Sequence, residues 1–306
     1  MSIDRIRIAT RQSKLALWQA NFIKSELERV HDGLVVEIVG ITTKGDRWLQ
    51  SPLSEIGGKG LFVKELESAM LAGEADIAVH SVKDLPAELP PEFVLPVLSY
   101  REDVRDVLVS DQGDLAGLPH GAVVGSSSLR RQAQLKAVRP DLNMRSIRGN
   151  VDTRLAKLKA GEFDAIVLAA AGLNRLGLQS EWSHLLDTEV CLPAPGQGAL
   201  GIECCEGSPA QTLLTPLQDE AVARCVIAER GISAGLGADC SLPIAAYACL
   251  DQNQQVELLA RIANEDGSQI LHSTAIGQDP DIVAQECVAS LISQGAEQIL
   301  TALRHP

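Results

Sequence analysis

Aromatic residues are scarce in this 306-residue sequence, where Phe, Trp and Tyr together make up 3%. Proteins that bind single-stranded nucleic acid stack bases on aromatic side chains, so this scarcity argues against that class. Long apolar runs are also missing, since stretches such as 165–173 fall well short of the ~18 residues that a membrane-spanning helix needs. The first residues, Met1–Arg7, contain no apolar core of a signal peptide. We therefore expect a cytoplasmic protein that has neither a membrane nor a nucleic acid as its partner.

Common catalytic and metal-binding motifs are absent as well. The sequence contains no GxGxxG, Walker loop, HExxH or GxSxG, so nucleotide and standard hydrolase chemistry have no support. All seven cysteines follow residue 190, and none lies in a CxxC pair or near a His at metal-ligand spacing. We expect free thiols and no metal. The seven are Cys191, Cys204, Cys205, Cys225, Cys240, Cys249 and Cys287.

The charges are distributed unevenly. The net charge is -13, and residues 177–306 carry all of the excess, with four Lys or Arg against 17 Asp or Glu. Residues 126–160 instead hold nine basic residues and only two acids, Asp141 and Asp152. Six of the nine are arginines, whose planar fork matches carboxylates and phosphates. A solvated helix face explains the lysines, but the arginines favour a local anion-binding site.

Hydrophobic periodicity indicates two units in which strands alternate with helices, as in a mostly parallel α/β sheet. The segment 43–60, rich in glycine, is expected to be a long mobile loop. For the first unit we predict strands at 3–10, 34–42 and 75–80 and helices at 14–30, capped by Ser13, and 61–71. For the second unit we predict strands at 122–125, 142–147 and 165–170 and helices at 129–138 and 151–160.

The rest of the chain is predicted to form a hinge and a small α+β domain. Residues 192–198 combine two prolines with two glycines, as a hinge strand would. Two α/β lobes with a hinge suggest a cleft that opens and closes. Beyond the hinge we predict a helix at 218–232, strands at 244–250, 256–262 and 270–275, and one long helix at 281–303.

Four groups of polar residues follow predicted strands. Ala9–Lys14 and Gly125–Arg131 each lead from a strand into the first turn of a helix, whose free N–H groups and dipole attract anions. Simple capping explains either junction alone, but a junction with arginine in each unit favours ligand binding. Val79–Pro86 ends an apolar strand, where open α/β sheets bind ligands, although an ordinary turn also explains it. Arg148–Asn150 and Arg154 surround another turn from a strand to a helix, which either binds a ligand or is an ordinary turn.

These motifs, in this order, resemble the porphobilinogen deaminase family nearly from end to end. The resemblance is carried by residues 8–13, 57–66, 75–84, 127–132, 148–151 and 192–199. It implies two α/β lobes similar to type II periplasmic binding proteins and a small α+β C-terminal domain that carries a cofactor cysteine. The implied domains are 1–99 with 199–216, 100–198, and 217–306.

The resemblance also implies an activity, a cofactor and a set of residues. Four porphobilinogen molecules would be joined head to tail with loss of ammonia on a covalent dipyrromethane primer, and hydrolysis would release the linear tetrapyrrole. Cys240 matches the family's attachment point for that primer, and Asp84 matches its catalytic acid. A monomer is expected. The residues that would bind cofactor and substrate are Arg11, Ser13, Ser81, Lys83, Ser126, Ser127, Ser128, Arg130, Arg131, Arg148, Arg154 and Arg175.

The alternative is a non-catalytic, two-lobed cytosolic protein that binds anions. It would share the lobes, the hinge and the helix N-termini. It would need neither Cys240 nor the C-terminal domain, and a carboxylate such as Asp84 would repel an anionic ligand. The enzyme is therefore the favoured interpretation.

Overall fold

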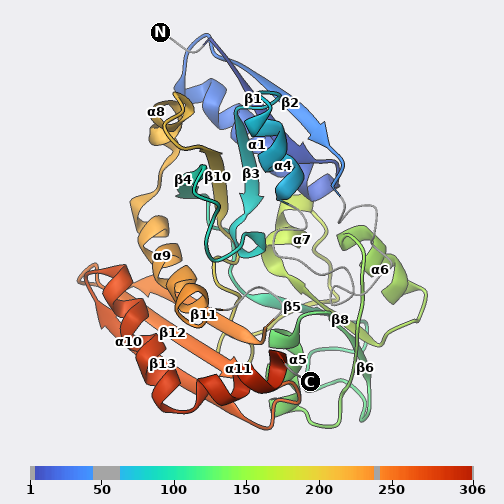
Figure 1. The fold of residues 1–306 in the computed structure, drawn as a ribbon. Coiled ribbons are helices and arrows are strands. Elements are labelled where there is room, and N and C mark those ends of the chain that lie inside the picture. Colours follow the sequence, from blue (N-terminus) through green and yellow to red (C-terminus); the bar gives the residue numbers. More distant parts are fainter. Residues whose placement is uncertain (1–3, 44–62, 238–241, 305–306) are drawn as a thin grey trace. The chain divides into compact units, whose positions relative to one another are not determined.

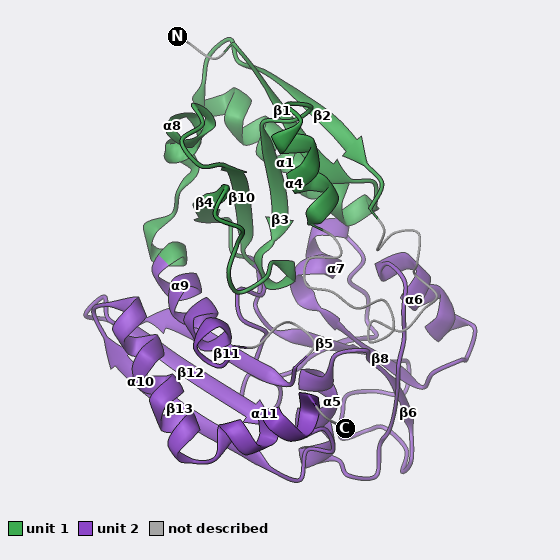
Figure 2. Cartoon of the chain, in the orientation of Figure 1, with its two compact units in different colours: residues 1–101, 199–223 green, residues 102–198, 224–306 purple. Residues whose placement is uncertain are grey.

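The computed structural model describes residues 4–43, 63–237 and 242–304 (Figure 1). The chain divides into two compact units, which Figure 2 colours separately. Unit 1 comprises residues 1–101 and 199–223, and unit 2 comprises residues 102–198 and 224–306. The first of the three predicted domains covers nearly the same residues as unit 1, and the other two lie almost entirely in unit 2. The three-domain division itself stays a prediction.

Unit 1 is built on a five-stranded sheet with the order β2-β1-β3-β10-β4. Strand β10 runs antiparallel to both of its neighbours, while β2, β1 and β3 are parallel. The strand bounds are β1 (Arg5–Arg11), β2 (Val35–Ile41), β3 (Ile77–Ser81), β4 (Phe93–Ser99) and β10 (Leu200–Cys205). The helices are α1 (Lys14–Val30), α4 (Lys64–Leu71), the short α8 (Ala210–Leu214), and the 3-10 turns η1 (Val82–Asp84) and η2 (Thr215–Leu217).

Sequence periodicity explains how α1 packs on this sheet. The Oγ of Ser13 accepts a hydrogen bond from the N–H of Ala16, which caps the first turn. Ile23 and Leu27, four residues apart on one side of the helix, are fully buried together with Ile8 of β1. The predicted helix at 14–30 therefore has the observed bounds.

The first part of unit 2 repeats the topology of unit 1. Its five-stranded sheet has the order β7-β6-β8-β5-β9, and here β5 is the strand that runs antiparallel to both neighbours. The strands are β5 (Asp106–Val109), β6 (Val123–Gly125), β7 (Asn143–Arg145), β8 (Ala165–Ala169) and β9 (Ser183–Leu185). The helices are α5 (Leu129–Val138), α6 (Val151–Lys159) and α7 (Ala170–Leu176).

The C-terminal part of unit 2 is a three-stranded antiparallel sheet with helices packed against it. One apolar core joins the strands to the helices, which Figure 1 draws in orange and red. The elements are α9 (Glu220–Gly235), which begins in unit 1, β11 (Ile244–Leu250), β12 (Val256–Ala263), β13 (Ile270–Gly277), α10 (Pro280–Ser293) and α11 (Ala296–Arg304).

The fold-class prediction is confirmed: the chain is α/β, with two lobes of one topology followed by a small α+β region. Two local predictions are wrong. The long helix expected at 281–303 is two helices, because Gly295 takes a left-handed φ of 104° between them. Residues 192–198 form no strand: 192–194 are irregular and 195–198 form a turn, with Gly198 at a φ of 87°. A Cβ on Gly198 would lie 2.4 Å from the carbonyl oxygen of Glu102. The backbones at residues 198 and 102 can therefore come this close only because residue 198 is a glycine.

Candidate active site

The predicted site residues of unit 1 gather at one edge of its sheet. β1 and β3 are parallel neighbours, with Ile8 opposite Ile77, so their carboxyl ends reach the same edge. β1 ends at Arg11 and β3 ends at Ser81, and η1 follows Ser81 directly. The structure therefore places five predicted residues at this edge: Arg11, Ser13, Ser81, Lys83 and Asp84.

Two contacts fix the turn that carries Asp84. The buried Gln19 of α1 donates from its Nε2 to the Oγ of Ser81 over 2.8 Å, which ties the helix to the end of β3. The N–H of Val82 donates to the carbonyl oxygen of Ala199 over 3.1 Å, and the Val82 side chain is buried. Asp84, at the end of this anchored turn, remains exposed. The turn before Asp84 is thus anchored to α1 and to the chain before β10, while Asp84 itself is exposed to solvent.

A buried contact between side chains of β3 and β10 joins the same strand to its neighbour. The Nε2 of His80 lies 2.8 Å from the Oε2 of Glu203 on the neighbouring β10, and both side chains are buried. The other carboxylate oxygen, Glu203 Oε1, is buried without a hydrogen-bond partner in the part of the chain that the structure describes. Sequence reasoning found neither this pair nor Gln19, because the partners come from distant parts of the chain.

In unit 2, the three predicted serines form the junction between β6 and α5. The Oγ of Ser126 accepts from the N–H of Ser128 over 3.2 Å, and the Oγ of Ser127 donates to the carbonyl oxygen of Ile147 over 2.7 Å. Ser128 occupies the N-cap position of α5, but its side chain makes no capping hydrogen bond. The first turn of α5 therefore has N–H groups that its cap residue does not satisfy, as in helices that bind anions.

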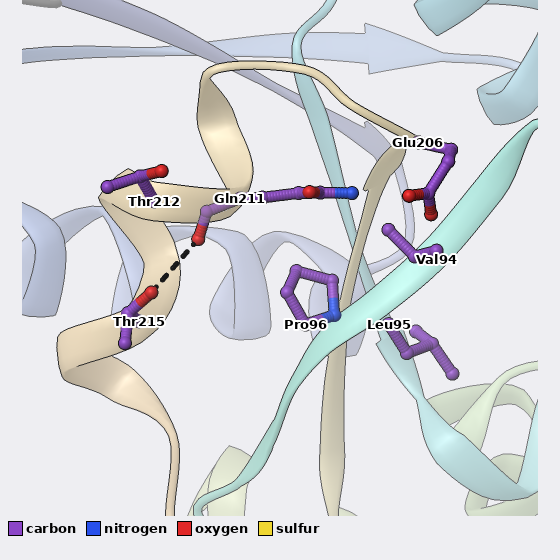
Figure 3. A pocket seen from close by; sticks show the side chains of 7 residues that line it. All are labelled: Val94, Leu95, Pro96, Glu206, Gln211, Thr212 and Thr215. Atoms are coloured by element: carbon purple, nitrogen blue, oxygen red, sulfur yellow. Dashed lines mark hydrogen bonds between the residues drawn. The ribbon is translucent and has the colours of Figure 1, made fainter.

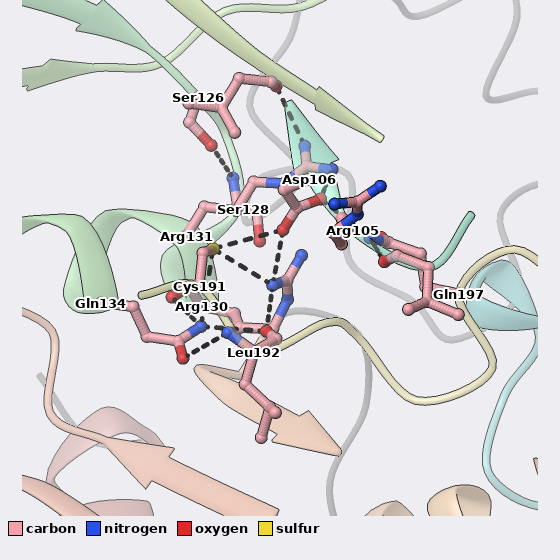
Figure 4. A network of polar contacts seen from close by, with 12 residues as sticks. Arg105, Asp106, Ser126, Ser128, Arg130, Arg131, Gln134, Cys191, Leu192 and Gln197 are labelled. Carbon is pink, nitrogen blue, oxygen red and sulfur yellow. Dashed lines mark hydrogen bonds and ion pairs between the residues drawn. The ribbon is translucent and has the colours of Figure 1, made fainter. Parts of the chain in front are cut away.

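Arg130 and Arg131, which follow this junction, are buried and share one carboxylate (Figure 4). Arg130 Nη1 lies 2.8 Å from Asp106 Oδ2, and Arg131 Nη2 lies 2.7 Å from Asp106 Oδ1. Burial by itself would raise the pKa of Asp106, but the two guanidinium groups outweigh it and hold that pKa far below its usual range. Burial likewise opposes the charge on Arg130, and Asp106 more than compensates, so that the pKa of Arg130 is raised.

Two further side chains complete this cluster. Gln197 donates from its Nε2 to Asp106 Oδ1 over 2.9 Å, and the thiol of Cys191 donates to Asp106 Oδ2 over 3.3 Å. Burial and the neighbouring carboxylate raise the pKa of Cys191 to about 12, which keeps the thiol protonated as a donor. Asp106 was missed at the sequence level. The excess of arginine in residues 126–160 could have indicated a buried acid, because a buried cation needs a buried anion as its partner.

The remaining predicted arginines of unit 2 have different surroundings. Arg148 is partly buried, which lowers its pKa, and its Nε has no hydrogen-bond partner among the described residues. Arg154 donates from its Nε to the carbonyl oxygen of Gly149 over 2.8 Å, which orders the turn before α6. Arg175 is buried, donates to the carbonyl oxygen of Gly198 over 2.7 Å, and has its pKa lowered by burial to about 10. Arg148 is the one of these three whose buried nitrogen still needs an acceptor.

Some predictions fall outside the described residues. Cys240, the predicted cofactor attachment point, is among them, as is almost all of the predicted loop at 43–60. The six cysteines that are described are free thiols, and four of them are buried. Within the described ranges, no group of three or more His, Cys, Asp or Glu side chains is arranged to hold a metal ion. The same ranges contain no helix with the length and apolar character required to cross a membrane.

A cavity of about 430 Å³ in unit 1 lies away from these residues, between β4 and the α8–η2 region (Figure 3). Pro96 and Gln211 are among the residues that line it, and none of the predicted site residues does. The candidate site is therefore the set of strand-end residues and not this cavity.

The fold and the candidate site define a protein with two α/β lobes of one topology, one with an exposed acid at a sheet edge and the other with arginines at a helix N-terminus. Residues 6–212 match the family model "Porphobilinogen deaminase, dipyromethane cofactor binding domain". Residues 223–293 match the model "Porphobilinogen deaminase, C-terminal domain". The chain therefore belongs to the porphobilinogen deaminase family, which confirms the resemblance read from its motifs.

Individual relatives agree with this assignment. A protein from Thiobacillus denitrificans (strain ATCC 25259 / T1) named porphobilinogen deaminase is 51% identical over 302 residues, which cover 97% of this chain and 98% of that one. Among solved structures, a methionine-binding protein has a TM-score of 0.47 at 12% identity, over 72% of this chain and 93% of that one. The periplasmic aliphatic sulphonate binding protein of Escherichia coli has a TM-score of 0.39 at 15% identity, over 76% and 70%. These structural likenesses are too distant to carry an argument.

Proposed function

We propose that the chain is a cytoplasmic hydroxymethylbilane synthase. It condenses four porphobilinogen molecules head to tail, releases one ammonia at each addition, and finally frees the linear tetrapyrrole by hydrolysis. The observation that carries this proposal is the match to both family models, which together span most of the chain. The exposed Asp84 at a sheet edge among Arg11, Ser81 and Lys83 supports it with the chemistry that the reaction needs.

The residues present fit a covalent dipyrromethane held through its carboxylates. Among the described residues, the buried Nε atoms of Arg148 and Arg131 have no hydrogen-bond acceptor, and the α5 N-terminus has N–H groups that Ser128 does not cap. Acetate and propionate side chains would supply such acceptors. Attachment through Cys240 stays a prediction. When bound, the dipyrromethane supplies the free pyrrole carbon to which the first substrate is joined.

Asp84 acts on the substrate at the point where charge develops. Breaking the C–N bond of porphobilinogen releases ammonia and leaves a cationic methylene-pyrrole, and the Asp84 carboxylate stabilises that cation. Formation of the new C–C bond then leaves one proton to be removed, and the same carboxylate is placed to accept it. The frame formed by Gln19, Ser81 and Val82 keeps the carboxylate in position while the chain grows.

The arginines divide into two roles. Arg148, whose buried Nε has no hydrogen-bond partner in the described part of the chain, is the strongest candidate for contact with a substrate carboxylate. Arg130 and Arg131 contribute positive charge at the first turn of α5, and Arg154 orders the turn that presents Arg148. Arg11 and Arg175 are also proposed to bind the pyrrole carboxylates, and Ser13, Ser81, Lys83, Ser126, Ser127 and Ser128 to add hydrogen bonds. We further propose a monomer with no nucleic-acid or membrane partner.

Purified protein incubated with porphobilinogen tests the proposal. The enzyme consumes four porphobilinogen molecules and releases four ammonia molecules for each linear tetrapyrrole formed. A non-catalytic anion-binding protein would bind porphobilinogen, as titration calorimetry would detect, and release no ammonia. Binding without release of ammonia would therefore reject the proposed function in favour of that alternative.

A further inference from the structure

Strand direction brings Asp106 to the arginine-bearing end of α5. β5 runs antiparallel to β8, with Asp106 opposite Ala169, the last residue of β8. The first residue of β5 therefore lies at the edge where β6 and β8 end and where α5 begins. An acid at any later position of β5 would lie farther from this edge. The topology thus gives the carboxylate of Asp106 access to the side chains of the first turn of α5.

The charges around Asp106 do not cancel. One carboxylate, fully buried, faces two guanidinium groups that are 4% and 7% exposed. The other two groups that donate to it, the Gln197 amide and the Cys191 thiol, are neutral. One positive charge therefore remains at the N-terminal turn of α5, where it adds to the positive end of the helix dipole.

The two arginines are also fixed in direction. Arg130 Nη1 donates to the carbonyl oxygen of Leu192 over 2.5 Å, and Arg131 Nη1 donates to the carbonyl oxygen of Val167 over 3.1 Å. With these contacts and Asp106 in place, Arg131 Nε is a buried donor that lacks a partner within the described residues. The cluster therefore holds two cations in one orientation, and Figure 4 shows the contacts around Asp106 that fix them.

We propose that Asp106 is a positioning residue for the substrate chain: by fixing Arg130 and Arg131, it sets the affinity of the Ser126–Ser128 junction for pyrrole carboxylates. The inference rests on the proposed function, because the polycarboxylate chain is the ligand that this junction would hold. Asp106 itself repels carboxylates and is fully buried, so it acts through the arginines and not on the substrate.

The test compares Asp106→Asn with the control Asp141→Asn. Asp141 pairs with Arg139 at the other end of α5, over 2.7 Å, and lies outside the site. We expect Asp106→Asn to raise the KM for porphobilinogen about 10-fold or more with kcat within about 2-fold of wild type, because a charge-assisted contact contributes on that scale and Asp84 is untouched. Asp141→Asn should leave both constants unchanged.

A double-mutant cycle distinguishes positioning from a general loss of structure. If Asp106 acts through Arg131, the variant Arg131→Gln with Asp106→Asn should have a KM no higher than Arg131→Gln alone. Additive increases in KM would overturn the proposal, as would a folded Asp106→Asn variant with the wild-type KM. A fall in kcat at unchanged KM would also overturn it.

Asp106→Asn leaves two buried cations without a counter-ion, so a second variant covers the case in which it fails to fold. Arg131→Lys keeps the positive charge beside Asp106 but loses the fork that also reaches Val167. A KM about 10-fold higher for Arg131→Lys than for wild type would support the proposal that Asp106 orients Arg131. A wild-type KM for Arg131→Lys would overturn it. A wild-type chain that forms no tetrapyrrole would overturn both this inference and the proposed function, whereas an active wild type with unaffected variants overturns this inference alone.

Discussion

The two five-stranded sheets have the same strand order, and each contains one antiparallel strand with a buried carboxylate, yet the carboxylates are used differently. On β10 of unit 1, Glu203 pairs with a single histidine, and one of its oxygens has no partner in the described part of the chain. On β5 of unit 2, Asp106 has two arginines and two neutral donors. In the same topology, the buried carboxylate therefore has one histidine partner in unit 1 and two arginine partners in unit 2.

The two lobes share a strand order but differ in the charges that surround their buried carboxylates. In unit 1 the proposed functional charge is the exposed Asp84, and the buried His80–Glu203 contact joins β3 to β10. In unit 2 the proposed functional charges are arginines at a helix N-terminus, which the buried carboxylate of Asp106 pairs with. Under the proposed function, unit 1 would supply the chemistry and unit 2 the binding of carboxylates.

The largest expected effect is on the stability of the two buried carboxylate sites. Asp106→Asn leaves two cations unpaired, so we expect it to lower the free energy of unfolding by about 3–5 kcal/mol. Glu203→Gln removes one charge from a pair that an amide can still join by a hydrogen bond, so a loss of about 1 kcal/mol is expected. Urea unfolding of both variants measures the difference. Equal losses would contradict the proposed contrast between the lobes.

Acid pH should reduce the difference in the free energy of unfolding between wild type and Asp106→Asn. The pKa of Asp106 is lowered in the folded protein, so its stabilisation is present above the ordinary pKa of about 4 and is lost as pH falls below it. The two proteins should therefore differ most at neutral pH and progressively less below about pH 4. Urea midpoints measured from pH 7 to pH 3 check this, and a gap that widens at low pH would contradict it.

Asp84→Asn should be the most damaging change to catalysis in unit 1. The amide keeps the shape of the side chain but cannot stabilise a cation, so we expect kcat to fall by about 10²–10³-fold with fold and cofactor intact. Ammonia release measures turnover, circular dichroism and intact mass check fold and cofactor, and the exposed Asp32→Asn is a matched control. Near-normal product formation by Asp84→Asn would reject the catalytic assignment.

Arg148→Ala is expected to have a smaller effect, on binding in unit 2. Loss of one charge-assisted contact should lower kcat/KM by about 10–100-fold and slow elongation or cofactor loading. Lys159→Ala, an exposed base in the same stretch of sequence, should be neutral. Wild-type kinetics for Arg148→Ala, and also for Arg130→Ala, would mean that this basic stretch is only a solvated surface.

The sequence predicted locally encoded features well. Helices α1 and α5 have the predicted bounds, because capping residues and apolar spacing lie within the helix and its first neighbours. β5 and β10 were not predicted, because they are short, buried on both faces and paired with strands far away in the chain. Asp106 was missed for the same reason: its role depends on an antiparallel placement that local patterns do not encode. Motif resemblance pointed to Asp84 and the arginines, but not to the side chains that hold them.

The intact mass of the purified protein, followed by peptide mapping, tests whether the chain is a synthase primed by a covalent cofactor. We expect an excess equal to two pyrrole units on the peptide that contains Cys240, absent from Cys240→Ser and retained in Cys205→Ser. If the protein is isolated unmodified, it should acquire this mass on incubation with porphobilinogen. A chain that acquires no mass on Cys240 and forms no tetrapyrrole under those conditions would rule out a primed synthase.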